Sequence, residues 1–153
     1  MGRIDRRLAE LKIELPSPVP PVATYVPYVI SGHLVFISGQ ISFVGGTLIK
    51  GRLGADMDVE RGQEAARACG INLIAQLKVA TGGDLDRVRR IVKLGAFVNS
   101  TPDFTDQPKV ANGCSDLMVA VFGEAGKHAR AAVGAPGLPL GSAVEIDGIF
   151  EIQ

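Results

Sequence analysis

The C-terminal run from Gly126 to Gln153 reads as two apolar strands joined by a Gly/Pro-rich connection, and each strand carries a charge. Arg130 stands between two alanines, and Glu145 stands between a valine and an isoleucine. Unpaired charge beside a core is costly, so the two side chains either pair with each other or face a ligand. Because a guanidinium never loses its proton and fits a carboxylate, Arg130 is the first candidate for binding an acidic small molecule.

Two long helices are predicted upstream of this run. The first covers Asp58 to Thr81, where apolar residues recur at helical spacing and Asp58 is an N-cap candidate. The pair Gly82-Gly83 ends it. The second covers Gln107 to Phe122, and the apolar stretch Arg89 to Asn99 between the helices reads as a long buried strand.

Three further strands are expected before the first long helix. β-Branched and aromatic residues dominate Thr24–Ile30 and 33–38, with a Ser-Gly turn between them. A third strand, Thr47–Arg52, follows the Gly45-Gly46 turn. Tight links of this kind predict an antiparallel meander.

The first 22 residues form an extension ahead of a domain at 23–153. Apolar residues of Arg3–Ile13 fall on one face, which predicts a short amphipathic helix. Four prolines between residues 16 and 21 end that helix and make a stiff link. We expect this segment to contribute packing rather than chemistry.

The order of these elements predicts an α+β fold, in which a mixed sheet carries the two long helices on one face. Small residues are frequent in both helices, as close helix-on-sheet packing requires. The other face of the sheet is expected to be apolar. Such a face cannot be left in water, so we expect another subunit to cover it.

Charge and composition limit the classes of partner. The chain has 16 acidic and 16 basic side chains, which leaves no basic surplus for binding nucleic acid. No stretch has the length and apolar character of a membrane span or a signal peptide, and we infer a cytoplasmic protein. The two cysteines, Cys69 and Cys114, lack metal-ligand spacing and are expected to be buried free thiols; no metal is predicted.

An ordered set of short motifs resembles the Rid family of YjgF-like reactive intermediate deaminases, also called endoribonuclease L-PSP proteins. The separation of the arginine from the glutamate, 145 − 130 = 15, follows the family pattern. The N-terminal extension and the loop GAPGLPLGS are similar to a less studied branch. The matching residues are Pro27-Tyr28, 36–40, Val92-Lys93, Asp103-Phe104, 110–112, Ala129-Arg130, Leu138-Pro139 and 144–147.

The resemblance implies a chorismate-mutase-like fold assembled as a homotrimer. The three sheets would form a central barrel, with ligands in clefts between subunits. Deaminases of this family hydrolyse imines or enamines, such as 2-aminoacrylate, to 2-oxo acids and ammonia without a cofactor. The implied partner is therefore a small metabolite that bears a carboxylate.

The resemblance assigns the catalytic work to Arg130 and Glu145. Arg130 would bind the substrate carboxylate, and Glu145 would either orient and deprotonate the attacking water or hold the substrate nitrogen protonated. Two alternatives remain open: Arg130 as a structural partner of Glu145 or Asp147, and Glu145 as an ordinary barrel-lining carboxylate. Asp147 faces the same side of the strand and is a weaker candidate for the same work.

The resemblance also implies a set of residues that line the pocket. Tyr28 would close the site, or is an ordinary half-buried strand tyrosine. Asn112 would lie near the cleft, or is a helix-surface amide. Ser38 and Gly39 would form the wall, although Gly39 is alternatively a β-bulge. The carbonyl of Ala132 would contact the substrate nitrogen or water.

The chain departs from the deaminases directly after the arginine. Ala131 and Ala132 stand where a serine and a small or cysteine residue are usual, which removes a side-chain hydroxyl. The departure keeps a second function open, a non-catalytic protein that binds a 2-oxo acid. RNA cleavage is disfavoured by the zero net charge and few aromatics. His128 lies two residues before Arg130 and either faces the same cleft or, as we expect, is a solvent-exposed residue at the strand start.

Overall fold

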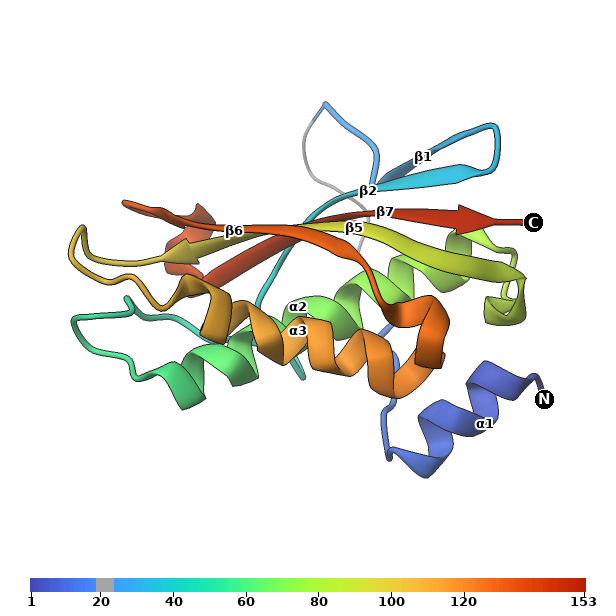
Figure 1. The fold of residues 1–153 in the computed structure, drawn as a ribbon, viewed down its shortest axis with the longest axis horizontal. Coiled ribbons are helices and arrows are strands. Elements are labelled where there is room, and N and C mark those ends of the chain that lie inside the picture. The colour runs from blue at the N-terminus through green and yellow to red at the C-terminus, as the bar shows by residue number, and fades with distance from the viewer. Residues whose placement is uncertain (19–23) are drawn as a thin grey trace.

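The computed structural model describes residues 1–18 and 24–153, and it has the predicted α+β architecture. A five-stranded mixed sheet forms one layer. The long helices α2 (Val59–Ala80) and α3 (Gln107–Phe122) lie together on one face of this sheet (Figure 1). The hydrophobic core fills the space between the two layers.

The strand order in the sheet is β1-β2-β7-β5-β6. The β5–β6 pair is parallel, and the other neighbouring pairs are antiparallel. Because β5 lies between them, the two C-terminal strands β6 and β7 are not neighbours. The strands are β1 (Tyr28–Ser31), β2 (Leu34–Ile41), β5 (Val88–Asn99), β6 (Ala129–Ala135) and β7 (Val144–Ile152), and short 3-10 turns η1 (Leu85–Arg87), η2 (Gly123–Gly126) and η3 (Pro139–Gly141) precede β5, β6 and β7.

Both long helices begin and end where the sequence predicts. The Asp58 side chain accepts the backbone N–H of Arg61 at 2.8 Å and caps α2, and Gly82, at a φ of 68°, turns the chain after it. Pro108 lies in the first turn of α3, where its missing N–H is not needed, and Gly123 ends that helix. None of the helices in 1–18 and 24–153 is long and apolar enough to cross a membrane.

The prediction for the third strand is wrong in extent and placement. Only Thr47–Leu48 (β4) is a strand, and it pairs with β3 (Phe43–Val44) in a separate two-stranded ribbon. Gly45 and Gly46 both have positive φ values, so they close a two-residue turn that joins just these short strands. The expected three-stranded meander is therefore reduced to the β1–β2 hairpin, whose first strand starts at Tyr28 rather than Thr24.

The N-terminal helix α1 (Arg3–Glu10) packs outside the two layers, against α3 and η1 (Figure 1). Ile4 and Leu8 are buried in this contact. The Asp86 carboxylate of η1 accepts the backbone N–H groups of Arg3 and Ile4 at 2.8 and 2.9 Å, and these donors hold the pKa of Asp86 below its usual range. The predicted domain boundary at residues 22 and 23 lies outside the described residues.

The second face of the sheet, which we call the open face, exposes apolar side chains on four strands. No helix in the part of the chain that the structure describes covers it (Figure 1). Val29, Phe36, Phe97 and Val133 lie on this face on four different strands, with exposed fractions of 53, 41, 37 and 48 %. An apolar surface of this extent fits the expectation that another chain covers it.

The close approach of α2 and α3 is tested by Gly113→Ala. A Cβ atom at Gly113 would overlap the backbone carbonyl of Gln63 on α2, so the two helices would have to separate. We expect the free energy of unfolding, measured with urea, to fall by about 1–3 kcal/mol, although alanine by itself favours a helix by about 1 kcal/mol. The control is Gly137→Ala, where nothing lies within 4 Å of the added atom. Equal stability of the two variants would contradict the tight contact.

Candidate functional site

Arg130 reaches from β6 towards α3. Its Nη1 atom donates to Asn112 Oδ1 at 2.8 Å and to Ser115 Oγ at 3.1 Å. Asn112 and Ser115 are three residues apart, so they lie on the same face of α3. Because a guanidinium only donates, the Asn112 amide must turn its oxygen to the arginine. The structure thus brings together two of the predicted residues, Arg130 and Asn112.

One edge of the Arg130 guanidinium has no hydrogen-bond partner among the described residues. Asn112 and Ser115 use both hydrogens on Nη1. Among the described residues, no protein group bonds to Nε or Nη2, whose N–H groups form the other edge. Two parallel N–H groups of this kind bind a carboxylate bidentately. The side chain is half-buried, which strengthens such a bond relative to one in bulk water.

His128 belongs to the same cluster, so the expectation of a solvent-exposed histidine is wrong. It is half-buried, with Nε2 at 2.8 Å from Ser115 Oγ and Nδ1 at 2.6 Å from the Gly126 carbonyl oxygen. Sequence reasoning missed Ser115 altogether. Its spacing of three residues from Asn112 within a predicted helix is the signal that could have identified it.

Glu145 lies on the opposite face of the sheet from Arg130. It pairs with Phe97 of β5 and projects from the open face, whereas Arg130 pairs with the buried Leu94 and reaches the helices. Within one chain, Arg130 is therefore not a structural partner of Glu145 or Asp147. The two predicted catalytic residues of one chain do not meet, because the sheet separates them.

Gly39 lies against Glu145. A Cβ atom at Gly39 would be 2.9 Å from the carboxyl carbon of Glu145, so a side chain at this position would displace that carboxylate. The register of β2 against β7 also shifts between Ile37 and Gln40, which places a bulge at Ser38 and Gly39. The structure therefore contains the bulge, and the bulge brings backbone beside a predicted catalytic residue.

Two carboxylates of β7, Glu145 and Asp147, ionise less readily than ordinary carboxylates. Burial, followed by repulsion from Asp147, raises the pKa of Glu145. Burial also raises the pKa of Asp147, and this effect exceeds the lowering by the backbone N–H of Gly95 and by the charge of Lys93. Asp147 shares the open face with Glu145, as predicted. Glu145 therefore retains its proton to a higher pH than an ordinary glutamate, which suits a group that must donate and accept protons.

Of the remaining predicted residues, Ser38 and Tyr28 lie apart from Arg130 in one chain, whereas Ala132 lies beside it on β6. Ser38 Oγ donates to the Val26 carbonyl at 2.8 Å, and the half-buried Tyr28 packs against the core. Ala132 follows Arg130 by two residues on the same side of β6 and also packs against the core. Since β6 is an edge strand, alternate backbone groups along it point away from the sheet.

The two cysteines are free and buried, as predicted. Burial raises the pKa of the Cys114 thiol to about 12 and raises that of Cys69 as well. Both thiols therefore remain protonated near neutral pH, and neither supplies a thiolate nucleophile.

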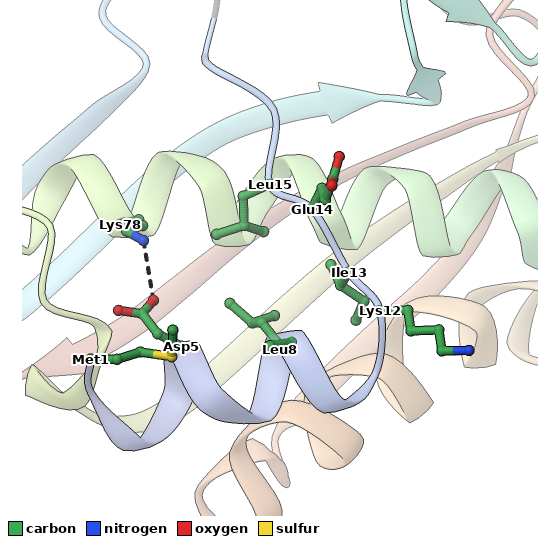
Figure 2. Close-up of a pocket in the computed structure, with 9 residues that line it drawn as sticks. Met1, Asp5, Leu8, Lys12, Ile13, Glu14, Leu15 and Lys78 are labelled. Carbon is green, nitrogen blue, oxygen red and sulfur yellow. Dashed lines mark hydrogen bonds and ion pairs between the residues drawn. The ribbon is translucent and has the colours of Figure 1, made fainter.

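A surface hollow of about 860 Å³ lies between α1 and α2, away from the residues described above. Figure 2 shows Leu8, Ile13 and Leu15 around it, and the ion pair between Lys78 and Asp5, 3.1 Å long, at one end. A second hollow, of about 360 Å³, lies at the C-terminal end of β6. Neither hollow is lined by a predicted site residue.

Comparison with known proteins finds a family model that matches residues 5–151, described as "YjgF/chorismate mutase-like, putative endoribonuclease". Protein TCP17 from Trypanosoma cruzi is 51 % identical over an alignment of 155 positions, and the match covers 99 % of this chain and 96 % of that protein. The crystal structure of Atu1372 from Agrobacterium tumefaciens, a protein of unknown function, is 47 % identical with a TM-score of 0.92. The match covers 98 % of this chain and 92 % of the Atu1372 chain.

A more distant likeness is to TdcF from Escherichia coli, whose crystal structure contains bound serine. It is 26 % identical, with a TM-score of 0.63, and the match covers 90 % of this chain and 94 % of TdcF.

The raised pKa of Glu145 predicts a pH-dependent stability. Between about pH 4.3, the ordinary glutamate value, and the raised value, the folded protein binds more protons than the unfolded chain. This contribution to stability is therefore complete below that window and is lost as the pH rises through it. We expect Glu145→Gln, which cannot ionise, to be more stable than wild type at neutral pH and to show a flatter profile.

Urea midpoints measured at one protein concentration between about pH 4 and about pH 8 test this expectation. The control is Glu151→Gln, on the same strand and the same face. An unchanged slope in Glu145→Gln would contradict the assignment of the titrating group.

Proposed function

Because the chain belongs to the YjgF/chorismate mutase-like family, we propose that it hydrolyses small 2-imino or enamine acids to 2-oxo acids and ammonia. One observation carries the proposal. The Arg130 guanidinium is held at Nη1 by Asn112 and Ser115, and its other edge remains for a substrate carboxylate. The serine bound to TdcF supports a small ligand of this kind, since serine carries a carboxylate beside a nitrogen.

The reaction adds water to the imine and then expels ammonia. Arg130 binds the carboxylate while a water attacks the imine carbon. Glu145 takes a proton from this water and gives it to the nitrogen, which forms the carbinolamine. The proton of the carbinolamine hydroxyl then moves through Glu145 to the nitrogen. The C–N bond breaks at the same time, and the 2-oxo acid and ammonia are released. The raised pKa of Glu145 favours both halves of this transfer.

The proposed site needs more than one copy of the chain. Arg130 faces the helices and Glu145 faces the open face, so we propose that Arg130 of one subunit acts beside Glu145 of another. The apolar open face supports a homotrimer in which three sheets form a central barrel. Tyr28, Ser38, Gly39 and the Ala132 carbonyl would complete each cleft. We predict that the reaction uses no cofactor or metal. A cytoplasmic location and the absence of nucleic-acid partners also stay predictions.

Ala131 and Ala132 favour a second candidate function. Both residues after Arg130 lack a hydroxyl or thiol that could assist a proton transfer. The same arginine would then hold a 2-oxo acid in a protein that binds this metabolite without turning it over. Binding of a 2-oxo acid without hydrolysis of any imine distinguishes this candidate from the deaminase.

A coupled assay with Arg130→Ala tests the deaminase. An amino-acid oxidase generates 2-imino acids in place, and the formation of 2-oxo acid is followed with and without the protein. We expect wild type to accelerate it and Arg130→Ala to lose about 100-fold, because a bidentate charged contact is removed. Arg67→Ala, on the exposed side of α2, is the control and retains the rate. Full activity in Arg130→Ala contradicts the proposal.

A charge on the open face tests the assembly. We expect Phe97→Glu to convert a trimer into monomers and to abolish activity, because it places a carboxylate inside the proposed barrel. Sedimentation equilibrium measures the mass. Val79→Glu, at an apolar residue of α2 that is 49 % exposed, is the matched control and leaves the trimer intact. A wild-type monomer that turns over imines would show that one chain suffices.

A further inference from the structure

We propose that His128 positions Arg130 through the Ser115 hydroxyl, so that the arginine presents a fixed edge to its ligand. The inference rests on the proposed role of Arg130 in binding a carboxylate. Ser115 and His128 contact the Nη1 side of the cluster, whereas the ligand edge is formed by Nε and Nη2. Neither residue is assigned a role by the family resemblance.

The hydrogen bonds in this cluster can be assigned a direction. The Gly126 carbonyl only accepts, so the hydrogen of a neutral His128 lies on Nδ1, at 2.6 Å from that oxygen. Nε2 is then an acceptor, and the Ser115 hydroxyl must donate to it across 2.8 Å. The Ser115 oxygen, having directed its proton to His128, turns a lone pair to Arg130 Nη1 at 3.1 Å. The chain of bonds runs from Arg130 to Ser115 to His128 to Gly126.

His128 decides which way the serine points. A serine hydroxyl in a helix can instead donate to a carbonyl of the preceding turn, since it rotates freely. With its proton held by His128, Ser115 is an acceptor for Arg130 and joins Asn112 in occupying both hydrogens of Nη1. Rotation of the guanidinium would break both bonds, so its ligand edge keeps one orientation.

The far end of the chain of bonds is itself rigid. Gly126 is buried, and a Cβ atom there would overlap the Met118 carbonyl of α3. The carbonyl that orients His128 therefore comes from backbone packed directly on the helix that carries Ser115. This contact fixes η2 relative to α3 and holds both ends of the imidazole.

Two substitutions of His128 separate its two hydrogen bonds. Asparagine can place a donor near the Nδ1 position and keep the bond to Gly126, but it has no acceptor that reaches Ser115. Glutamine can place an acceptor near the Nε2 position and keep the bond from Ser115. If His128 positions Arg130, His128→Gln retains pyruvate binding and His128→Asn weakens it about tenfold by calorimetry. If the histidine only secures the backbone at η2, this ranking reverses, and the proposal is overturned.

Ser115 provides the second pair of variants. We expect Ser115→Ala to weaken pyruvate binding as much as His128→Asn does, and Ser115→Thr to retain it, because the hydroxyl remains. The double variant Ser115→Ala/His128→Asn is no weaker than Ser115→Ala alone, since both changes act through one oxygen. In the coupled assay the loss appears in KM with kcat retained. His33→Asn and Ser17→Ala, both at exposed positions, are the controls.

A ligand-free measurement separates this inference from the proposed function. The 15N signals of the Arg130 side chain, assigned with Arg130→Lys, report rotation of the guanidinium. Slow rotation in wild type and His128→Gln, with fast rotation in His128→Asn and Ser115→Ala, supports the positioning role even if wild type binds no pyruvate. Equal rotation in all four proteins overturns it, whatever the ligand results.

Discussion

The close packing of α2 and α3 on one face of the sheet is the contact on which the candidate site depends. Each helix brings glycine to the seam: added Cβ atoms at Gly62 and Gly70 of α2 would contact side chains of α3, and one at Gly113 of α3 would overlap the α2 backbone. Because these glycines let the two helices approach closely, α3 lies at a fixed height above β6. That height lets Asn112 and Ser115 reach Arg130.

The same sheet that supports the site also divides it. Side chains alternate between the two faces of a strand, so Arg130 is turned to the helices and Glu145 to the open face. Within one chain the free edge of Arg130 does not meet Glu145, and no described helix covers the apolar open face. Assembly of several chains would bring Arg130 beside Glu145 and would also cover the open face. The proposed chemistry and the proposed trimer therefore depend on each other.

Local signals in the sequence predicted the long elements well. The helix starts follow from the Asp58 cap and from Pro108 in the first turn, which act within a few residues of the chain. The strand predicted at Thr47–Arg52 was misplaced, because membership of a sheet depends on a partner that a short segment does not specify. The environment of His128 was also predicted wrongly, because its hydrogen-bond partner, the Ser115 hydroxyl, lies on a different element that the local sequence does not specify.

The sequence by itself determined the α+β order, the family and the two charged candidates, because periodicity, caps and motif spacing are properties of neighbouring residues. It did not determine that Arg130 and Glu145 face opposite sides of the sheet, nor that Ser115 and His128 stand behind the arginine. Those facts depend on strand register and on the placement of α3 over β6. Only the tertiary structure decides them, since each bond joins residues that the chain brings together from separate elements.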